Sequence, residues 1–198
     1  MIKKKDLLGP VTIFSYNMSP KNTDPSKVKE EGKEWLLCGL ENSRNRLRIY
    51  LEKNNVSDPK SMKNREPKNY DDSKVEKIDK RAVDDGYLSG KWEFPILPEK
   101  VDEVWSDIRD LVEQDRIWGA QVTTEWIREK KDSEKHIIRV YTPNYLDKSD
   151  VMRVGNLLKD RCGIKEDIYY KPDIYNILQV YSKEGDDMKL PKEIRYEM

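Results

Sequence analysis

Histidine, cysteine and long apolar runs are scarce in this chain of 198 residues. There is one histidine, His136, and there are two cysteines, Cys38 and Cys162. Neither cysteine has the closely spaced Cys or His companions of a zinc site or a disulfide framework, so we expect two reduced thiols and no metal site. No segment approaches the ~20 apolar residues that cross a membrane. The basic start "MIKKKDLLGPVTIF" has an apolar part broken by Gly9 and Pro10 and no convincing cleavage site, which predicts a cytoplasmic protein without a membrane partner.

An excess of charge of one sign is missing as well. Lys and Arg number 38, Asp and Glu number 38, and the net charge is zero although 38% of the residues are charged. Because long-range attraction to phosphates needs clustered cations, this balance gives no signal for duplex DNA, and a nucleic-acid partner would need a local patch. No glycine-rich phosphate loop and no nucleophile motif occurs, so no cofactor is expected.

From residue 88 onward, the order of predicted elements is typical of an α+β domain. Residues 88–96 alternate as a strand, and Pro98 begins a helix that runs to about Gln114 with one apolar stripe. Two further strands are predicted at 119–127 and 136–144, joined as a hairpin, and a second helix at 147–163 ends at Gly163. Residues 167–182 then supply one interrupted strand or two consecutive ones. This order predicts helices packed on one face of a mostly antiparallel sheet.

The N-terminal third has a less regular pattern. Between residues 25 and 54 the apolar spacing suits a helix, a turn at 39–45, and a second helix or strand. Residues 54–75 are rich in charge and almost free of aliphatic side chains, which predicts a mobile linker. We therefore expect an N-terminal extension over residues 1–75 that packs on a main domain at 76–198.

The two faces of the predicted sheet differ in chemistry. Because side chains alternate across a strand, Ala120, Val122 and Trp126 are assigned to the side covered by helices. Cations, amides and phenols on the opposite side suit a phosphate and a flat ring. The alternative is a face that meets water, whose Tyr and Arg only form cross-strand pairs. The residues assigned to this side are Lys91, Gln121, Thr123, Glu125, Arg139, Tyr141, Tyr169, Lys171, Tyr175, Gln179 and Tyr181.

The segment "YKPD" interrupts the last strand pattern at residues 170–173. A proline within a strand belongs at an edge or a bulge, where it can re-aim neighbours such as Lys171 and Asp173. An ordinary bulge with a surface ion pair is the alternative.

His136 and the tryptophans are the remaining candidates for chemistry. As the only imidazole, His136 would be the general acid of any catalysis near neutral pH, unless it is structural. Trp105 and Trp126 are assigned to the core. Trp92 and Trp118 lie near element ends, where an indole could stack on a base or simply pack.

Several ordered motifs carry a family resemblance: "GKW", "VDEVW", "HIIRVYTPNYLD", "VMRVGNLL" and "YYKPDIY". Over about residues 88–182 the chain resembles the basophilic-leukaemia-expressed (Bles) family. That resemblance implies a curved antiparallel sheet backed by helices, like the messenger-RNA cap-binding translation initiation factor. It also brings the family's label as a phosphothreonine lyase domain.

Each implied activity suggests its own residues. A cap-type site would place a charged base between two tryptophans above a glutamate, and Trp92, Trp118 and Glu93 are of the right types. A phosphothreonine lyase would need a lysine base, a histidine acid and an arginine clamp, and Lys135, His136 and Arg139 supply those types. His136 and Arg139, however, should point to opposite faces of a regular strand.

The leading interpretation is a binding module for a phosphorylated ligand, a nucleotide or an RNA end. A lyase-like enzyme with His136 as its acid and a protein-interaction domain without small-ligand chemistry remain the alternatives. The residues predicted to bind the ligand are Arg139, Lys171, Lys91, Tyr141, Tyr175, Trp92 and Gln121.

Overall fold

A six-stranded sheet forms the centre of the computed structural model, which describes residues 23–40, 44–58, 73–178 and 194–198. The strand order is β1-β3-β4-β2-β5-β6, and every neighbouring pair is antiparallel. The predicted α+β class with an antiparallel sheet is therefore confirmed. The strands are β1 (Trp35–Cys38), β2 (Gly90–Ile96), β3 (Gly119–Thr123), β4 (His136–Thr142), β5 (Tyr169–Pro172) and β6 (Tyr196–Glu197).

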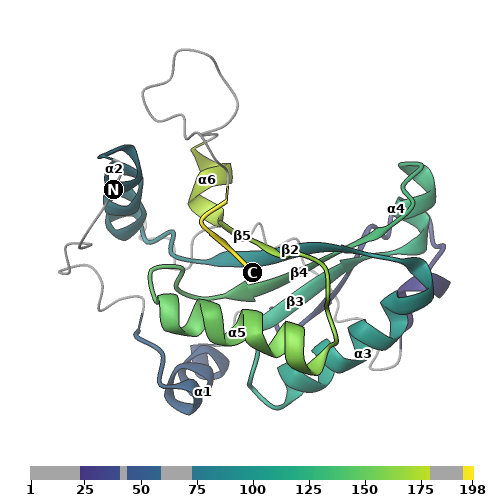
Figure 1. The fold of residues 1–198 in the computed structure, drawn as a ribbon, viewed down its shortest axis with the longest axis horizontal. Coiled ribbons are helices and arrows are strands. Elements are labelled where there is room, and N and C mark those ends of the chain that lie inside the picture. Colours follow the sequence, from purple (N-terminus) through teal and green to yellow (C-terminus); the bar gives the residue numbers. More distant parts are fainter. Residues whose placement is uncertain (1–22, 41–43, 59–72, 179–193) are drawn as a thin grey trace, which may run out of the picture.

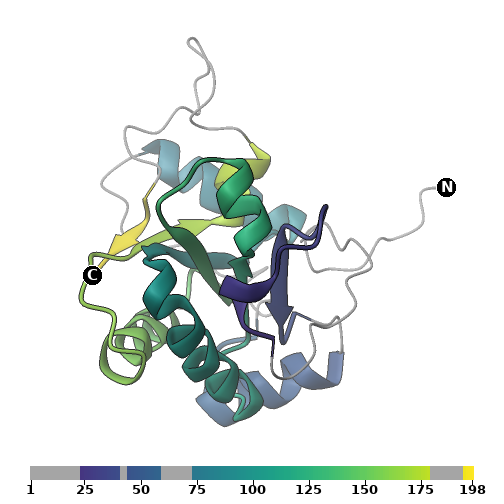
Figure 2. The same cartoon turned by 90° about the vertical axis from the view of Figure 1, so that its right-hand side faces the viewer.

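Two long helices, α3 (Pro98–Glu113) and α5 (Lys148–Arg161), cover one face of the sheet (Figure 1). Figure 2 shows them together on the same side, with α1 (Arg44–Asn54) next to α3. Both helices were predicted, and their apolar stripes are buried against the sheet. Pro98 occupies the first turn of α3, where its missing N–H costs nothing. The buried stripe of α3 is Val101, Val104, Trp105, Ile108, Leu111 and Val112.

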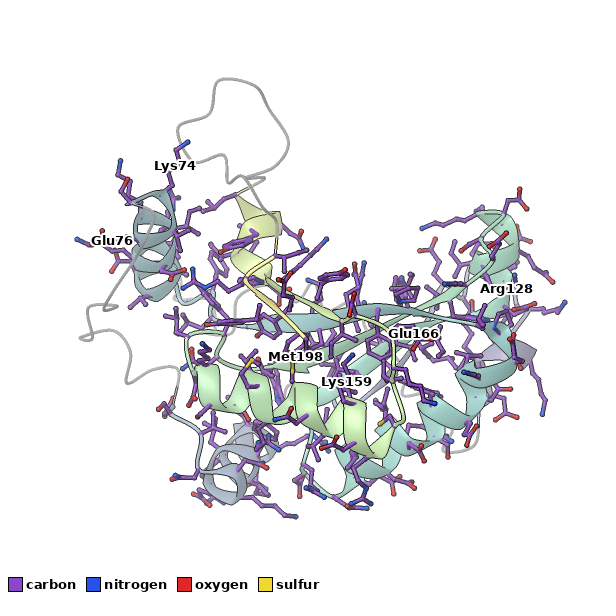
Figure 3. All side chains as sticks on the ribbon, in the orientation of Figure 1. Lys74, Glu76, Arg128, Lys159, Glu166 and Met198 are labelled. Atoms are coloured by element: carbon purple, nitrogen blue, oxygen red, sulfur yellow. The ribbon has the colours of Figure 1, made fainter. Side chains whose placement is uncertain are left out.

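The shorter helices lie mainly at the two ends of the sheet. Figure 3 shows α2 (Ser73–Asp85), with Lys74 and Glu76, at one end and α4 (Glu125–Lys130), with Arg128, at the other. Helix α6 (Asp173–Ile177) contacts α2, and a short 3-10 helix, η1 (Pro25–Lys27), contacts α3 and α4. No helix of the described residues is long and apolar enough to cross a membrane.

Strand pairing fixes which side chains share a face. We call the side covered by α3 and α5 the inner face; it carries Trp92, Phe94, Ile138 and Val140, all buried. The opposite side is the outer face. By register, it carries Trp35, Leu37, Lys91, Glu93, Pro95, Gly119, Gln121, Thr123, Ile137, Arg139, Tyr141, Tyr169, Lys171 and Glu197.

The predicted hairpin of residues 119–127 and 136–144 is wrong in its first half. Strand β3 ends at Thr123, and α4 begins where the strand was expected to continue. Thr124 caps this helix by accepting a hydrogen bond from the amide of Ile127, and Glu125 lies in its first turn. These local preferences outweigh the β-branched and aromatic composition of the segment. Trp126 is consequently only half-buried, with the Lys130 ammonium 4.5 Å from its ring centroid.

The strand expected after Pro172 is also wrong. Residues 173–177 form α6, while residues 179–181 lie outside the described residues. The amide of Asp173 donates to the carbonyl of Ser89, and its carboxylate accepts bonds from Ser89 and Lys91, so the chain turns into a helix here. Tyr175 therefore points into the core.

The region predicted as an N-terminal extension contributes to the sheet. Residues 35–38 form the edge strand β1, paired with β3, where a helix was expected, whereas the second predicted element is helix α1. Helix α2 begins at Ser73, inside the predicted linker, and residues 59–72 lie outside the described residues. The domain boundary near residue 75 stays a prediction.

Buried polar contacts hold the peripheral elements in place. The fully buried carboxylate of Asp79 on α2 accepts bonds from the Tyr145 hydroxyl at 2.7 Å and from Arg195 Nη2 at 2.8 Å. The ion pair between Asp79 and Arg195, the residue before β6, ties the start of this strand to α2. The Tyr50 hydroxyl on α1 donates to Asp150 on α5 over 3.0 Å. Met198, labelled in Figure 3, lies next to Gly155 on the strand side of α5 and packs against the hydrophobic core.

Candidate functional site

Arg139 is the central cation of the outer face. Its Nε donates a 2.6 Å hydrogen bond to Glu93 Oε2, and its Cζ lies 4.6 Å from the ring centroid of Trp35. The side chain is 31% exposed. Among the described residues, its two Nη groups make no hydrogen bond. Within the described part of the chain, the guanidinium is thus fixed from two sides while its outer N–H edge stays open.

Strand order brings these groups together. Strand β4 lies between β2 and β3, so Glu93 and Gln121 stand directly opposite Arg139 on its two sides. Trp35 stands opposite Thr123 on β1, one strand further out. A planar guanidinium stacks well on an indole and pairs well with a carboxylate, which explains the orientation of Arg139.

Lys91 forms a second, closed group on the same face. Its ammonium lies 2.5 Å from Asp173 Oδ1, and the Ser89 hydroxyl donates to Asp173 Oδ2 over 2.6 Å. Lys91 is only 5% exposed, and its Nζ lies 5.8 Å from the Tyr141 ring centroid. Lys171 stands opposite Lys91 on β5 and is half-buried. Lys91 is therefore already neutralised by a carboxylate.

Five of the predicted ligand-binding residues lie on one face, as strand alternation indicated. They are Lys91, Gln121, Arg139, Tyr141 and Lys171. Their role as a binding site stays a prediction. Tyr141 is buried in a small cluster formed with Tyr50, Val56 and Trp118, so α1 covers that part of the face. The accessible part is centred on Arg139, with Trp35 and Gln121 to one side and Tyr169 and Lys171 to the other.

Trp92 and Tyr175 do not belong to this group. Trp92 is fully buried on the inner face, where its Nε1 donates to the Val151 carbonyl over 2.9 Å. Tyr175 is buried on α6 because residues 173–177 are helical. Trp118 is buried as well, so Trp92 and Trp118 cannot sandwich a base above Glu93. The indole that lies near Glu93 and Arg139 is Trp35, which sequence reasoning missed because residues 35–37 were assigned to a helix.

His136 is fully buried on the inner-face side of β4. Its Nδ1 lies 2.8 Å from the Thr123 carbonyl oxygen, and its Nε2 lies 3.2 Å from Glu125 Oε2. Arg128 donates to both oxygens of Glu125, and these bonds lower the pKa of the Glu125 carboxyl, aided by the nearby His136. His136 and Arg139 lie on opposite sides of the strand, and Lys135 is exposed. The acid, base and anion clamp of a lyase are therefore not assembled around His136.

No group of three or more His, Cys, Asp or Glu side chains among the described residues could hold a metal ion. Both cysteine thiols have pKa values raised to about 12, chiefly because burial disfavours the thiolate.

Solved structures of translation initiation factors resemble part of this chain. They include C. elegans eIF4E-3 with the 4E-binding protein Mextli and a cap analog (TM-score 0.40, 16% identity, 47% of this chain and 55% of that chain). Another is schistosome eIF4E with m7GpppA and 4E-BP (TM-score 0.40, 21% identity, 56% of this chain and 59% of that chain). A third is Ascaris suum eIF4E-3 with an m2,2,7G cap (TM-score 0.41, 18% identity, 57% of this chain and 59% of that chain). This chain spans less than two thirds of the length of these structures.

The sequence model of one protein family covers most of the chain. The family is described as basophilic leukemia-expressed protein Bles03, and the match extends over residues 12–179. This range includes both long helices and strands β1 to β5. The chain therefore belongs to the Bles03 family.

Proposed function

We propose that this protein is a binding module that takes a phosphorylated or nucleotide-like ligand on the outer face of its sheet. The open Nη edge of Arg139 is the observation that supports this proposal best. Glu93 holds Nε and Trp35 lies against the guanidinium, so the side chain is already oriented before a ligand arrives. Two parallel N–H groups match two oxygens of a phosphate, and prior ordering lowers the entropy cost of binding.

The neighbours of Arg139 can complete such a site. Gln121, directly opposite on β3, is half-buried and has an amide that can donate to a further oxygen. Tyr169, opposite Glu93 on β5, is 37% exposed and offers a flat ring to a base or another planar group. The half-buried Trp35 indole can offer a second ring on the β1 side.

Titration of the labelled protein by NMR tests the proposal, with adenosine monophosphate and a phosphothreonine peptide as probes. Arg139→Gln is the test variant, and Arg81→Gln is its control, because Arg81 forms an exposed pair with Asp85 on α2. A charge-assisted bidentate contact is worth roughly 1.5–3 kcal/mol, so we expect Arg139→Gln to weaken binding about ten- to a hundredfold. Arg81→Gln should leave the affinity unchanged.

Two results would contradict the proposal. One is no shift of outer-face signals with any phosphate-bearing probe at millimolar concentration. The other is equal binding of the unphosphorylated peptide, which would favour a protein-interaction domain. Thermal unfolding of Arg139→Gln, followed by circular dichroism, shows whether the variant is still folded.

A further inference from the structure

The charges of the outer face cancel among the described residues. Three cations, Lys91, Arg139 and Lys171, share the face with the carboxylates of Glu93 and Glu197 and with that of Asp173, which reaches Lys91 from α6. A site that binds several phosphates needs a surplus of positive charge, because each added phosphate brings more repulsion from nearby carboxylates. Counted over the residues that the structure describes, this face offers no such surplus.

The cations also differ in what they can still bind. Lys91 is nearly inaccessible and lies 2.5 Å from Asp173, whose second oxygen is occupied by Ser89. Releasing Lys91 toward a ligand would strand a carboxylate that is itself largely buried. Arg139, by contrast, already satisfies Glu93 through Nε and can receive two oxygens at its Nη edge without breaking that bond.

We infer that the ligand of this face presents a single phosphate group, bound end-on by Arg139, and that Asp173 sets this limit by occupying Lys91. The inference rests on the function proposed above and narrows its ligand to phosphate monoesters. On the β2 and β5 side of the first phosphate, a second one would meet Glu93 or the closed Lys91–Asp173 pair, neither of which offers an open donor, and Lys171 is already engaged in an interaction.

The probes are inorganic phosphate, pyrophosphate and tripolyphosphate. They differ in the number of linked phosphates and carry no nucleoside or peptide. NMR titrations of the wild type should give affinities within about threefold of one another, whereas a site that engages each phosphate gains roughly tenfold per added contact of 1.4 kcal/mol. In Asp173→Asn, Lys91 is released, and pyrophosphate should bind at least about fivefold more tightly than phosphate. Asp85→Asn, which breaks an exposed pair on α2, is the matched control and should behave like the wild type.

The outcomes separate this inference from the proposed function. If the wild type binds pyrophosphate with an affinity tenfold or more above that for phosphate, the single-phosphate limit is overturned, whereas the proposed phosphate-binding face stands. If folded Asp173→Asn binds pyrophosphate no more tightly, relative to phosphate, than the wild type does, the role of Asp173 is overturned. If none of the three anions binds, the proposed function fails and the inference with it. Where the anions do bind, titration with adenosine monophosphate and with a phosphothreonine peptide shows whether the phosphate of the ligand is carried by a nucleoside or by a peptide.

Discussion

Trp35 lies against the guanidinium of Arg139, with 4.6 Å between the ring centroid and Cζ. The two residues come from β1 and β4, and β3 lies between them in the sheet. Such a contact orients the guanidinium and shields one of its faces from water, so that an incoming anion meets an ordered donor edge.

Replacing Trp35 tests this arrangement without changing any charge. Trp35→Ala should lower the affinity for a phosphate monoester about three- to tenfold, because the guanidinium loses a cation–π contact worth roughly 0.5–1 kcal/mol and its fixed orientation. Trp35→Phe keeps an aromatic face and should lie closer to the wild type. NMR or calorimetric titration measures the affinities of the wild type, Trp35→Ala and Trp35→Phe. Equal affinities would show that Trp35 does not contribute to binding.

A glycine next to this strand provides a test of packing. Gly39 has φ +71°, and a Cβ there would meet Val112 Cγ1 at 2.5 Å and the Trp118 carbonyl oxygen at 2.7 Å. Gly32 has φ +81° with no atom within 4 Å of such a Cβ. A substitution there therefore measures the cost of the left-handed backbone conformation alone, without a steric clash. We expect Gly32→Ala to cost about 1 kcal/mol of unfolding free energy and Gly39→Ala to cost clearly more, about 2–4 kcal/mol. Urea unfolding of both variants measures the difference, and equal losses would contradict the close packing.

His136 should matter for stability and not for chemistry at the outer face. His136→Ala removes a fully buried ring and leaves the Thr123 carbonyl and Glu125 without its contacts, so the unfolding free energy should fall by about 2–4 kcal/mol. Lys135→Ala, at an exposed neighbour, should change it by less than about 0.5 kcal/mol. Phosphate affinity measured well below the melting temperature should be unchanged in His136→Ala. A selective loss of binding in the folded variant would show that His136 belongs to the site.

Glu125 makes the stability depend on acid. Hydrogen bonds from Arg128 lower the pKa of the Glu125 carboxyl below its ordinary value of 4.5. A carboxyl whose pKa is lower in the folded state stabilises the fold above the unfolded pKa, and that contribution is lost as the pH falls through the folded pKa. Between about pH 6 and about pH 3, wild-type protein should therefore lose more unfolding free energy than Glu125→Gln. Denaturant unfolding across this range measures both slopes; parallel slopes would show that Glu125 contributes nothing to the acid sensitivity.

Local sequence patterns predicted the elements with strong periodicity. The stripe from Val101 to Val112 predicted α3, Gly163 marked the end of α5, and alternation in β2 and β4 assigned Lys91, Arg139 and Tyr141 to one face. The failures occurred where a turn residue competed with composition. Thr124 begins a helix in a β-branched segment, and Pro172 and Asp173 begin another in an aromatic one.

The sequence by itself determined that the chain forms an antiparallel sheet with two amphipathic helices on one face, and which side chains of β2 and β4 share a surface. Periodicity and alternation are local properties, so they can be read without knowing any contact. Only the tertiary structure decided that Trp35, and not Trp92, lies beside Arg139, that Asp173 neutralises Lys91, and that α1 covers Tyr141. These relationships depend on strand order and on contacts between distant segments, which no local pattern encodes.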